Sequence, residues 1–201
     1  MKPEVQDLIV ELDATLGEAS SSRQSSMLRS VVALFLNGAE TYSEDQVALF
    51  DNVIGRLIAN ADRPTLVELS TTLAPVGNAP PKVMGRLASH EDIAIAGPVL
   101  DQFNALTEQT LVEVAKTKGP KHLAAIAGRP QIGESVTEVL IERGSAEIAL
   151  KLTCSQGCCF SELGFVKLIN RARSDKALAA AAANRSDVPL ELQPFLKQAL
   201  A

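Results

Sequence analysis

A repeat of about 27 residues runs from residue 78 to the end of the chain, and it constrains the fold more than any other feature. Each copy opens with an apolar residue and carries a second one eight positions later. The opening residues are Ala79, Leu106, Ile132, Phe160 and Val188, and the second residues are Leu87, Val114, Leu140, Leu168 and Leu196. Periods of this length are typical of arrays of stacked supersecondary units.

Each copy predicts two short helices. The opening residue is followed by Thr, Ser, Gly or Pro, which suit a helix cap or a first turn. Second helices are expected at residues 90–100, 119–128, 144–154 and 173–184. We align these four on Ile93, Leu123, Ile148 and Leu178. Two short helices cannot bury their own apolar face, whereas stacked copies can. The repeat therefore predicts an all-α fold, a right-handed α-α superhelix (α-solenoid) of two-helix repeats.

The same register predicts which residues form the core. Residues expected to be buried in first helices are Leu111, Leu140, Phe165 and Leu168, and those expected in second helices are Leu123, Ile126, Ala127, Ile148 and Leu152.

The front of the chain is less regular. Residues 3–16 carry an apolar stripe of helical period, "SSSRQSS" at 20–26 is either a polar break or a Ser-rich helix start, and Ser43 with Gln46 matches a capping box. The segment "PVGNAPP" marks a joint before the regular copies. We expect an acidic helical region at 1–75 and repeats at 76–201, packed together as one domain.

Charge and composition exclude several classes of partner. The net charge is −5, and residues 1–60 hold nine acidic against four basic side chains. Only 3% of the residues are aromatic, and an acidic chain with few aromatics is poorly suited to nucleic acids, which require basic stripes and stacking platforms. The longest strongly apolar uncharged run, residues 30–39, is too short to span a bilayer. The first residues lack the pattern of a signal peptide, so we expect a cytoplasmic protein without nucleic-acid or membrane partners.

The three cysteines lie within the six residues "CSQGCC", at Cys154, Cys158 and Cys159. A soft-metal or redox site is one interpretation. Zinc, however, needs four protein ligands, or three and a water, and the nearest histidine, His122, is more than thirty residues away. The pattern therefore favours free cysteines at a helix junction, with Cys154 the most buried, and no cofactor.

Several segments resemble a known family. They are "LFD" near residue 50, "NAPP" at 78–81, "LASHEDIAIAGPVL" at 87–100 and "AIAGRP" at 125–130. With these segments the chain resembles the bacterial family catalogued as domain of unknown function 2336, and more loosely the leucine-rich-variant and HEAT-like helical repeats. The resemblance implies an α-superhelical fold and brings no established activity or catalytic residues. The segment "TCSQGCCFSE" departs from the Gly/Asn-rich turn expected there.

The sequence contains no phosphate-loop, zinc-protease or serine-hydrolase motif, which disfavours an enzyme. We predict a non-enzymatic scaffold that binds a protein or peptide. The residues expected to point outward along the second helices and to bind that partner are Lys121, His122, Glu147, Lys151 and Lys176. Alternatives are a regulatory module that docks through its acidic N-terminal helices and an enzyme on a helical-repeat frame. The oligomeric state stays open.

Overall fold

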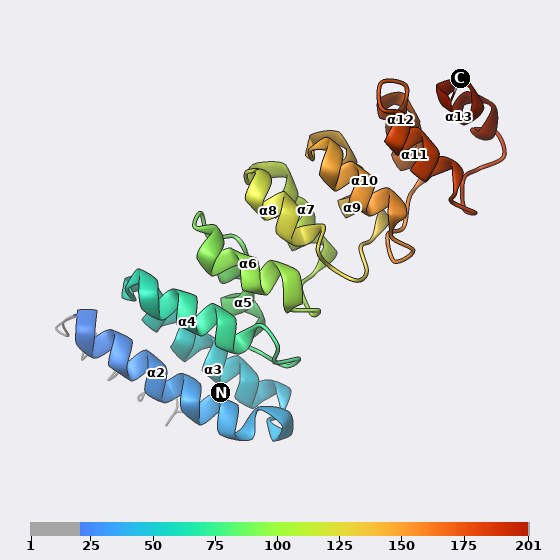
Figure 1. Cartoon of the computed structure of the whole chain (residues 1–201). Coiled ribbons are helices and arrows are strands. Elements are labelled where there is room, and N and C mark those ends of the chain that lie inside the picture. Colours follow the sequence, from blue (N-terminus) through green and yellow to red (C-terminus); the bar gives the residue numbers. More distant parts are fainter. Residues whose placement is uncertain (1–20, 201) are drawn as a thin grey trace. The chain divides into compact units, whose positions relative to one another are not determined.

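The protein is represented by a computed structural model that describes residues 21–200 (Figure 1). Within these residues the secondary structure is helical, apart from one isolated bridge between Ile132 and Cys158, so the all-α prediction is confirmed. The α-helices are α2 (Ser21–Gly38), α3 (Glu44–Leu57), α4 (Arg63–Leu73), α5 (Pro81–Ala88), α6 (Ile93–Gln102), α7 (Glu108–Thr117), α8 (Pro120–Ile126), α9 (Glu134–Arg143), α10 (Ala146–Cys154), α11 (Glu162–Ala172), α12 (Lys176–Ala183) and α13 (Gln193–Leu200). Short 3₁₀ turns follow α2 and α3 at Ala39–Thr41 and Ile58–Asn60. The helix predicted at 3–16 lies outside the described residues.

The described residues divide into two compact units. The first contains the residues up to Val99 together with Phe103–Ala105, and the second contains Leu100–Gln102 and the residues from Leu106 on. Helix α6 contributes to both. The boundary expected from the sequence, at residue 76, was set where the predicted repeat becomes regular. The boundary between the two packed units lies instead around residues 99–106. None of the described helices combines the length and apolar content needed to cross a bilayer.

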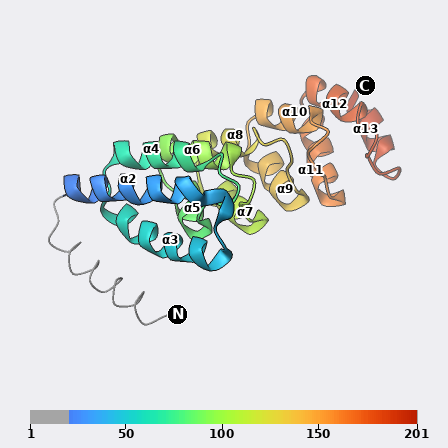
Figure 2. The ribbon, with the colours of Figure 1, turned by 90° about the horizontal axis from the view of Figure 1, so that it is seen from below.

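In the second unit, successive helix pairs pack on one another. Helix α7 contacts α9, α9 contacts α11, and α11 contacts α13, while α10 contacts α12. Figure 2 shows the first helices α7, α9 and α11 in one layer and the second helices α8, α10 and α12 in the other. All the core residues predicted from the register are buried: Leu111, Leu123, Ile126, Ala127, Leu140, Ile148, Leu152, Phe165 and Leu168. The register therefore predicted these buried positions of α7 to α11 correctly.

Side-chain caps fix where most of these helices begin. Thr107 caps α7 and Ser161 caps α11, as predicted, because each side-chain oxygen accepts a hydrogen bond from the backbone N–H three residues later. The last copy differs from the prediction. Pro189 lies in a turn, and α13 begins only at Gln193, with Pro194 in its first turn, where a missing N–H costs nothing.

The caps also correct the alignment of the second helices. The N-cap residues of α6, α8, α10 and α12 are Asp92, Gly119, Ser145 and Asp175. Three positions after these caps lie Ile95, His122, Ile148 and Leu178, all of them buried. The sequence alignment matched both Ile93 and Leu123 to Ile148, which is wrong. Counted from the caps, Ile93 comes two residues too early and Leu123 one residue too late. His122 consequently stands in the row of apolar core positions.

Three arginines each donate to a carbonyl near the end of a neighbouring helix. The guanidinium of Arg86, near the end of α5, donates to the Gly55 carbonyl of α3 at 2.7 Å. Arg143 of α9 donates in the same way to Ala115 of α7, and Arg171 of α11 to Ile141 of α9. Each of these carbonyls belongs to the third residue from the end of its helix, where intrahelical partners are lacking. The arginines therefore supply hydrogen-bond donors to carbonyls that have no partner within their own helices.

The first unit is built around α2. Helix α2 contacts α3 and α4, and α5 contacts both α3 and α4. Phe35 of α2 is fully buried and forms an aromatic cluster with Tyr42 and Phe50, with ring centroids 5.2 to 5.9 Å apart. The Ser43–Gln46 capping box is confirmed at the start of α3. From Ser21 on, the serine-rich segment is helical and is not a polar break, since α2 covers Ser21–Gly38.

Replacement of Leu140 by alanine tests the core register. Leu140 is fully buried in α9, so its truncation leaves a cavity and should lower the free energy of unfolding by about 2–5 kcal/mol. Chemical denaturation measures this change. The control is Ser135→Ala on the exposed side of α9, which should stay within about 0.5 kcal/mol of the parent chain. A near-neutral Leu140→Ala variant would contradict the register.

Replacement of Arg171 by alanine tests the arginine links. Its guanidinium also donates to the Gly144 carbonyl at 2.9 Å, so two carbonyls lose their donor. The expected loss is about 1–3 kcal/mol, since an unsatisfied polar group costs about that much. Arg173→Ala, an exposed arginine two residues further on, is the matched control and should be nearly neutral. Equal melting temperatures for the two variants would refute a structural role for the links.

Candidate functional site

Four of the five predicted partner-binding residues are exposed, and the fifth is not. Lys121, Glu147, Lys151 and Lys176 are accessible, whereas His122 is only 5% exposed. The prediction that His122 points outward is wrong, because its position three residues after the cap of α8 is equivalent to that of the buried Ile148. His122 is therefore part of the packing between helices and does not belong to the exposed surface of the second helices.

The other four do not stand at one level of the repeat. Lys121 and Glu147 are both the second residue of their helices, α8 and α10, and are equivalent. Lys151 is the sixth residue of α10, and Lys176 is the first residue of α12. Lys121 and Glu147 thus take the same position in two successive second helices. Lys151 lies about one turn after Glu147 in α10, and Lys176 comes one position earlier in α12 than Glu147 does in α10.

The cysteine segment is a joint between two loops. The backbone N–H of Ile132 donates to the Gly157 carbonyl at 3.0 Å, and that of Cys159 donates to the Ile132 carbonyl at 2.9 Å. A Cβ atom at Gly157 would lie 1.9 Å from the Pro130 carbonyl oxygen, so only glycine permits this approach. Cys158 is buried, whereas Cys154 and Cys159 are exposed, so the expectation that Cys154 is the most buried is wrong.

Arg185 holds the cysteine segment from the other side. Its guanidinium donates to the backbone carbonyls of Thr153, Ser155 and Cys158 at 2.8 to 3.1 Å. It also forms a bidentate pair with Asp187 and lies 4.6 Å from the centre of the Phe160 ring. A guanidinium with this many partners stabilises a single loop conformation.

The chemistry of the Cys158 thiol agrees with a structural role. Burial raises the pKa of the Cys158 thiol, although Ser155 and the charge of Arg185 oppose the change. A thiol of raised pKa is a poor nucleophile and a poor metal ligand at neutral pH. Within residues 21–200, no group of three or more His, Cys, Asp or Glu side chains is arranged to hold a metal ion.

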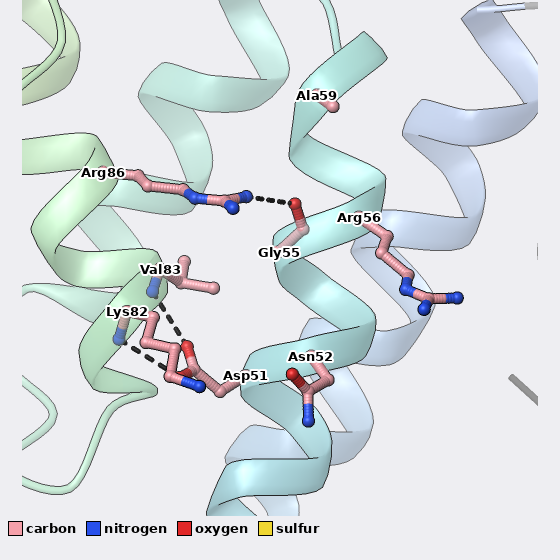
Figure 3. A pocket seen from close by; sticks show the side chains of 8 residues that line it. All are labelled: Asp51, Asn52, Gly55, Arg56, Ala59, Lys82, Val83 and Arg86. Carbon is pink, nitrogen blue, oxygen red and sulfur yellow. Dashed lines mark hydrogen bonds between the residues drawn. The ribbon is translucent and has the colours of Figure 1, made fainter. Parts of the chain in front are cut away.

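A pocket that the sequence did not predict lies between α3 and α5 (Figure 3). Its volume is about 440 Å³, and it is lined by Asp51, Asn52, Gly55, Arg56, Ala59, Lys82, Val83 and Arg86. Three of these side chains are basic, although the chain as a whole is acidic. The pocket is therefore a local basic site in the first unit.

Asp51 organises one end of this pocket. It is 4% exposed, and its carboxylate accepts hydrogen bonds from the backbone N–H groups of Val83 at 2.8 Å and Lys82 at 3.2 Å. Helix α5 begins after Pro80, which offers no capping side chain, so Asp51 of α3 caps α5 from outside. Both carboxylate oxygens are engaged with the backbone of α5.

The basic side chains have different positions in Figure 3. Arg86 reaches across to the Gly55 carbonyl, Lys82 lies beside Asp51, and Arg56 is turned away from α5. Lys82 and Arg86 are therefore the cations of the α5 wall. A local signal existed for these two cations, since they are four residues apart and therefore lie on one side of a helix. The α3 wall gave no such signal, because Asp51 is 31 residues away from Lys82 in the chain.

Serine variants of the cysteines test the structural role of the joint. Cys158→Ser places a hydroxyl at a buried site and should cost about 1–3 kcal/mol. Cys154→Ser and Cys159→Ser change exposed atoms and should stay within about 0.5 kcal/mol of the parent chain. Thermal or chemical unfolding gives the order. Stoichiometric zinc in the purified protein, with unfolding on chelation, would instead establish a metal site.

Comparison with known proteins places the chain in a family. The family model described as "Uncharacterised protein conserved in bacteria (DUF2336)" matches residues 95–195. Neither the curated proteins nor the solved structures gave a match. The looser likeness to HEAT-like repeats stays a prediction. The match covers half of the sequence, and the chain belongs to the DUF2336 family of bacterial proteins.

Proposed function

We propose that the chain is a non-enzymatic scaffold that binds a protein or peptide partner. Its two-helix repeats would continue as a right-handed α-solenoid, and the exposed sides of the second helices would form the binding surface. The observation that supports this most is that α8, α10 and α12 each use two adjacent rows of residues for packing and leave charged residues exposed at their N-terminal ends.

The geometry of stacked repeats suits an extended partner. Neighbouring helices in such arrays lie about 10 Å apart, so exposed residues on successive helices can contact one ligand at regular intervals. Three of the four exposed residues, Lys121, Lys151 and Lys176, are basic, and only Glu147 is acidic. We therefore expect the partner segment to be acidic. A cytoplasmic location fits this function and remains a prediction.

A second candidate is a regulatory module that docks through its acidic N-terminal region. The charge distribution favours it, because residues 1–60 carry nine acidic and four basic side chains while the rest of the chain is balanced. A basic partner surface would be the complement in this case. The two candidates predict binding surfaces of opposite charge, which one set of variants can distinguish.

Charge reversal at Lys121, Lys151 and Lys176 tests the proposed surface. Lysine-to-glutamate changes at all three should weaken capture of the partner from a lysate of the native bacterium. They should leave the melting temperature nearly unchanged, because exposed charges contribute little to stability. The matched control reverses Arg23, Lys116 and Lys197, which are exposed elsewhere and give the same change in net charge.

Capture is quantified by mass spectrometry of proteins retained by the parent chain, the variant and the control. A partner that is lost from the variant with Lys121, Lys151 and Lys176 reversed, and is retained by the control, supports the scaffold. Undiminished capture by the folded variant with the three reversed lysines would contradict the proposed surface and favour docking through the acidic first sixty residues.

A further inference from the structure

We infer that the pocket between α3 and α5 is a binding site for a ligand with at least two anionic oxygen groups, either phosphates or paired carboxylates. The site would bind its ligand whether or not the second-helix surface binds a partner, because it uses different residues. Its walls are Asp51 and Gly55 of α3, Ala59 of the 3₁₀ turn that follows α3, and the first turns of α5.

The carboxylate in the pocket is hydrogen-bonded to the backbone of α5 and not to its basic side chains. Asp51 accepts from the backbone N–H groups of Lys82 and Val83, and it forms no ion pair with either Lys82 or Arg86 in the described part of the chain. Neither basic side chain forms an ion pair with any other described residue. The pocket thus contains two cationic groups available to a ligand.

Arg86 is held in place before a ligand arrives. One guanidinium nitrogen donates to the Gly55 carbonyl at 2.7 Å, which fixes the side chain across the pocket. A guanidinium has five N–H donors in a planar fork, so most of its donors are still available for an oxyanion. Carboxylates and phosphates match this fork with two parallel hydrogen bonds. Because Arg86 is already ordered, binding would cost less conformational entropy.

Lys82 supplies the second charge. It lies four residues before Arg86, so the two side chains project from the same side of α5, one turn apart. Two cations at this separation can each contact a different anionic group of one ligand, whereas a single carboxylate engages only one of them. Asn52, on the α3 wall, adds an amide that can donate to an oxygen.

The size and polarity of the pocket agree with a small charged group. A volume of about 440 Å³ lies within the usual range of ligand sites, about 300–1,000 Å³. The lining consists mainly of charged and amide side chains and contains a single branched aliphatic residue, Val83. An anion can accept charge-assisted hydrogen bonds from the basic side chains, which an apolar ligand cannot, so the lining favours an anion.

Calorimetric titration of the 201-residue chain with two probes tests the inference. The probes are inorganic pyrophosphate and the peptide acetyl-Asp-Glu-Asp-Glu-amide, which represent phosphate and carboxylate ligands. At least one should bind saturably, with an affinity that falls as sodium chloride is added. Binding of pyrophosphate alone identifies a phosphate site, and binding of the peptide identifies a site for acidic protein segments.

Alanine at both Lys82 and Arg86 should weaken the binding by about tenfold or more, since charge-assisted hydrogen bonds are lost. The matched control, alanine at Arg23 and Lys116, removes the same charges from exposed helix surfaces and should bind as the parent chain does. Failure of the parent chain to bind either probe would overturn the inference, as would an equal loss in the control.

Arg86 also links α5 to α3, so its removal can disturb the fold. Two single variants keep the test valid in that case. Lys82→Ala removes only a side chain that makes no described bond and should weaken binding by about threefold or more. Arg86→Lys keeps the charge but loses the fork, and should bind more weakly than the parent chain. Unchanged affinity in both folded single variants would also overturn the inference.

Discussion

Apolar contact between successive helix pairs is the interaction on which the structure depends. The helices from α5 to α13 are short: α8 has seven residues, and the others have eight to eleven. Helices of this length are marginally stable in water on their own. Their stability comes from rows of aliphatic residues, such as Val114, Leu140 and Leu168, that neighbouring pairs bury together. Burial of each such side chain contributes roughly 1.5–3 kcal/mol.

Stacking short helices brings many helix ends close together, and their unpaired carbonyls must find donors. The chain solves this with arginines, of which Arg143 and Arg171 take the same position, the tenth residue, in α9 and α11. Arg86, Arg143 and Arg171 serve the ends of first helices, and Arg129 and Arg185 reach back to the ends of second helices. Arg86 combines this structural role with the charge that defines the α3–α5 pocket, so packing and the proposed anion site share one residue.

The sequence was sufficient for the helical fold class and for the buried positions of α7 to α11, because apolar residues recur there at helical spacing. It was insufficient for the alignment of the second helices, because their most apolar residues do not stand at one distance from their caps. Around Gly119 this displaced the alignment by one position and placed the buried His122 outside. The pocket was missed for another reason: Asp51 and Lys82 are 31 residues apart and meet only through the packing of α5 on α3.

Amide hydrogen exchange within the second unit tests the central claim, that neighbouring pairs stabilise one another. In a stacked array each helix depends on its neighbours, so helices packed on two sides should open less often than a terminal one. The amides of α9, which contacts α7 and α11, should therefore exchange most slowly, and those of α13 most quickly. Equal protection of α9 and α13, or faster exchange in α9, would contradict the account.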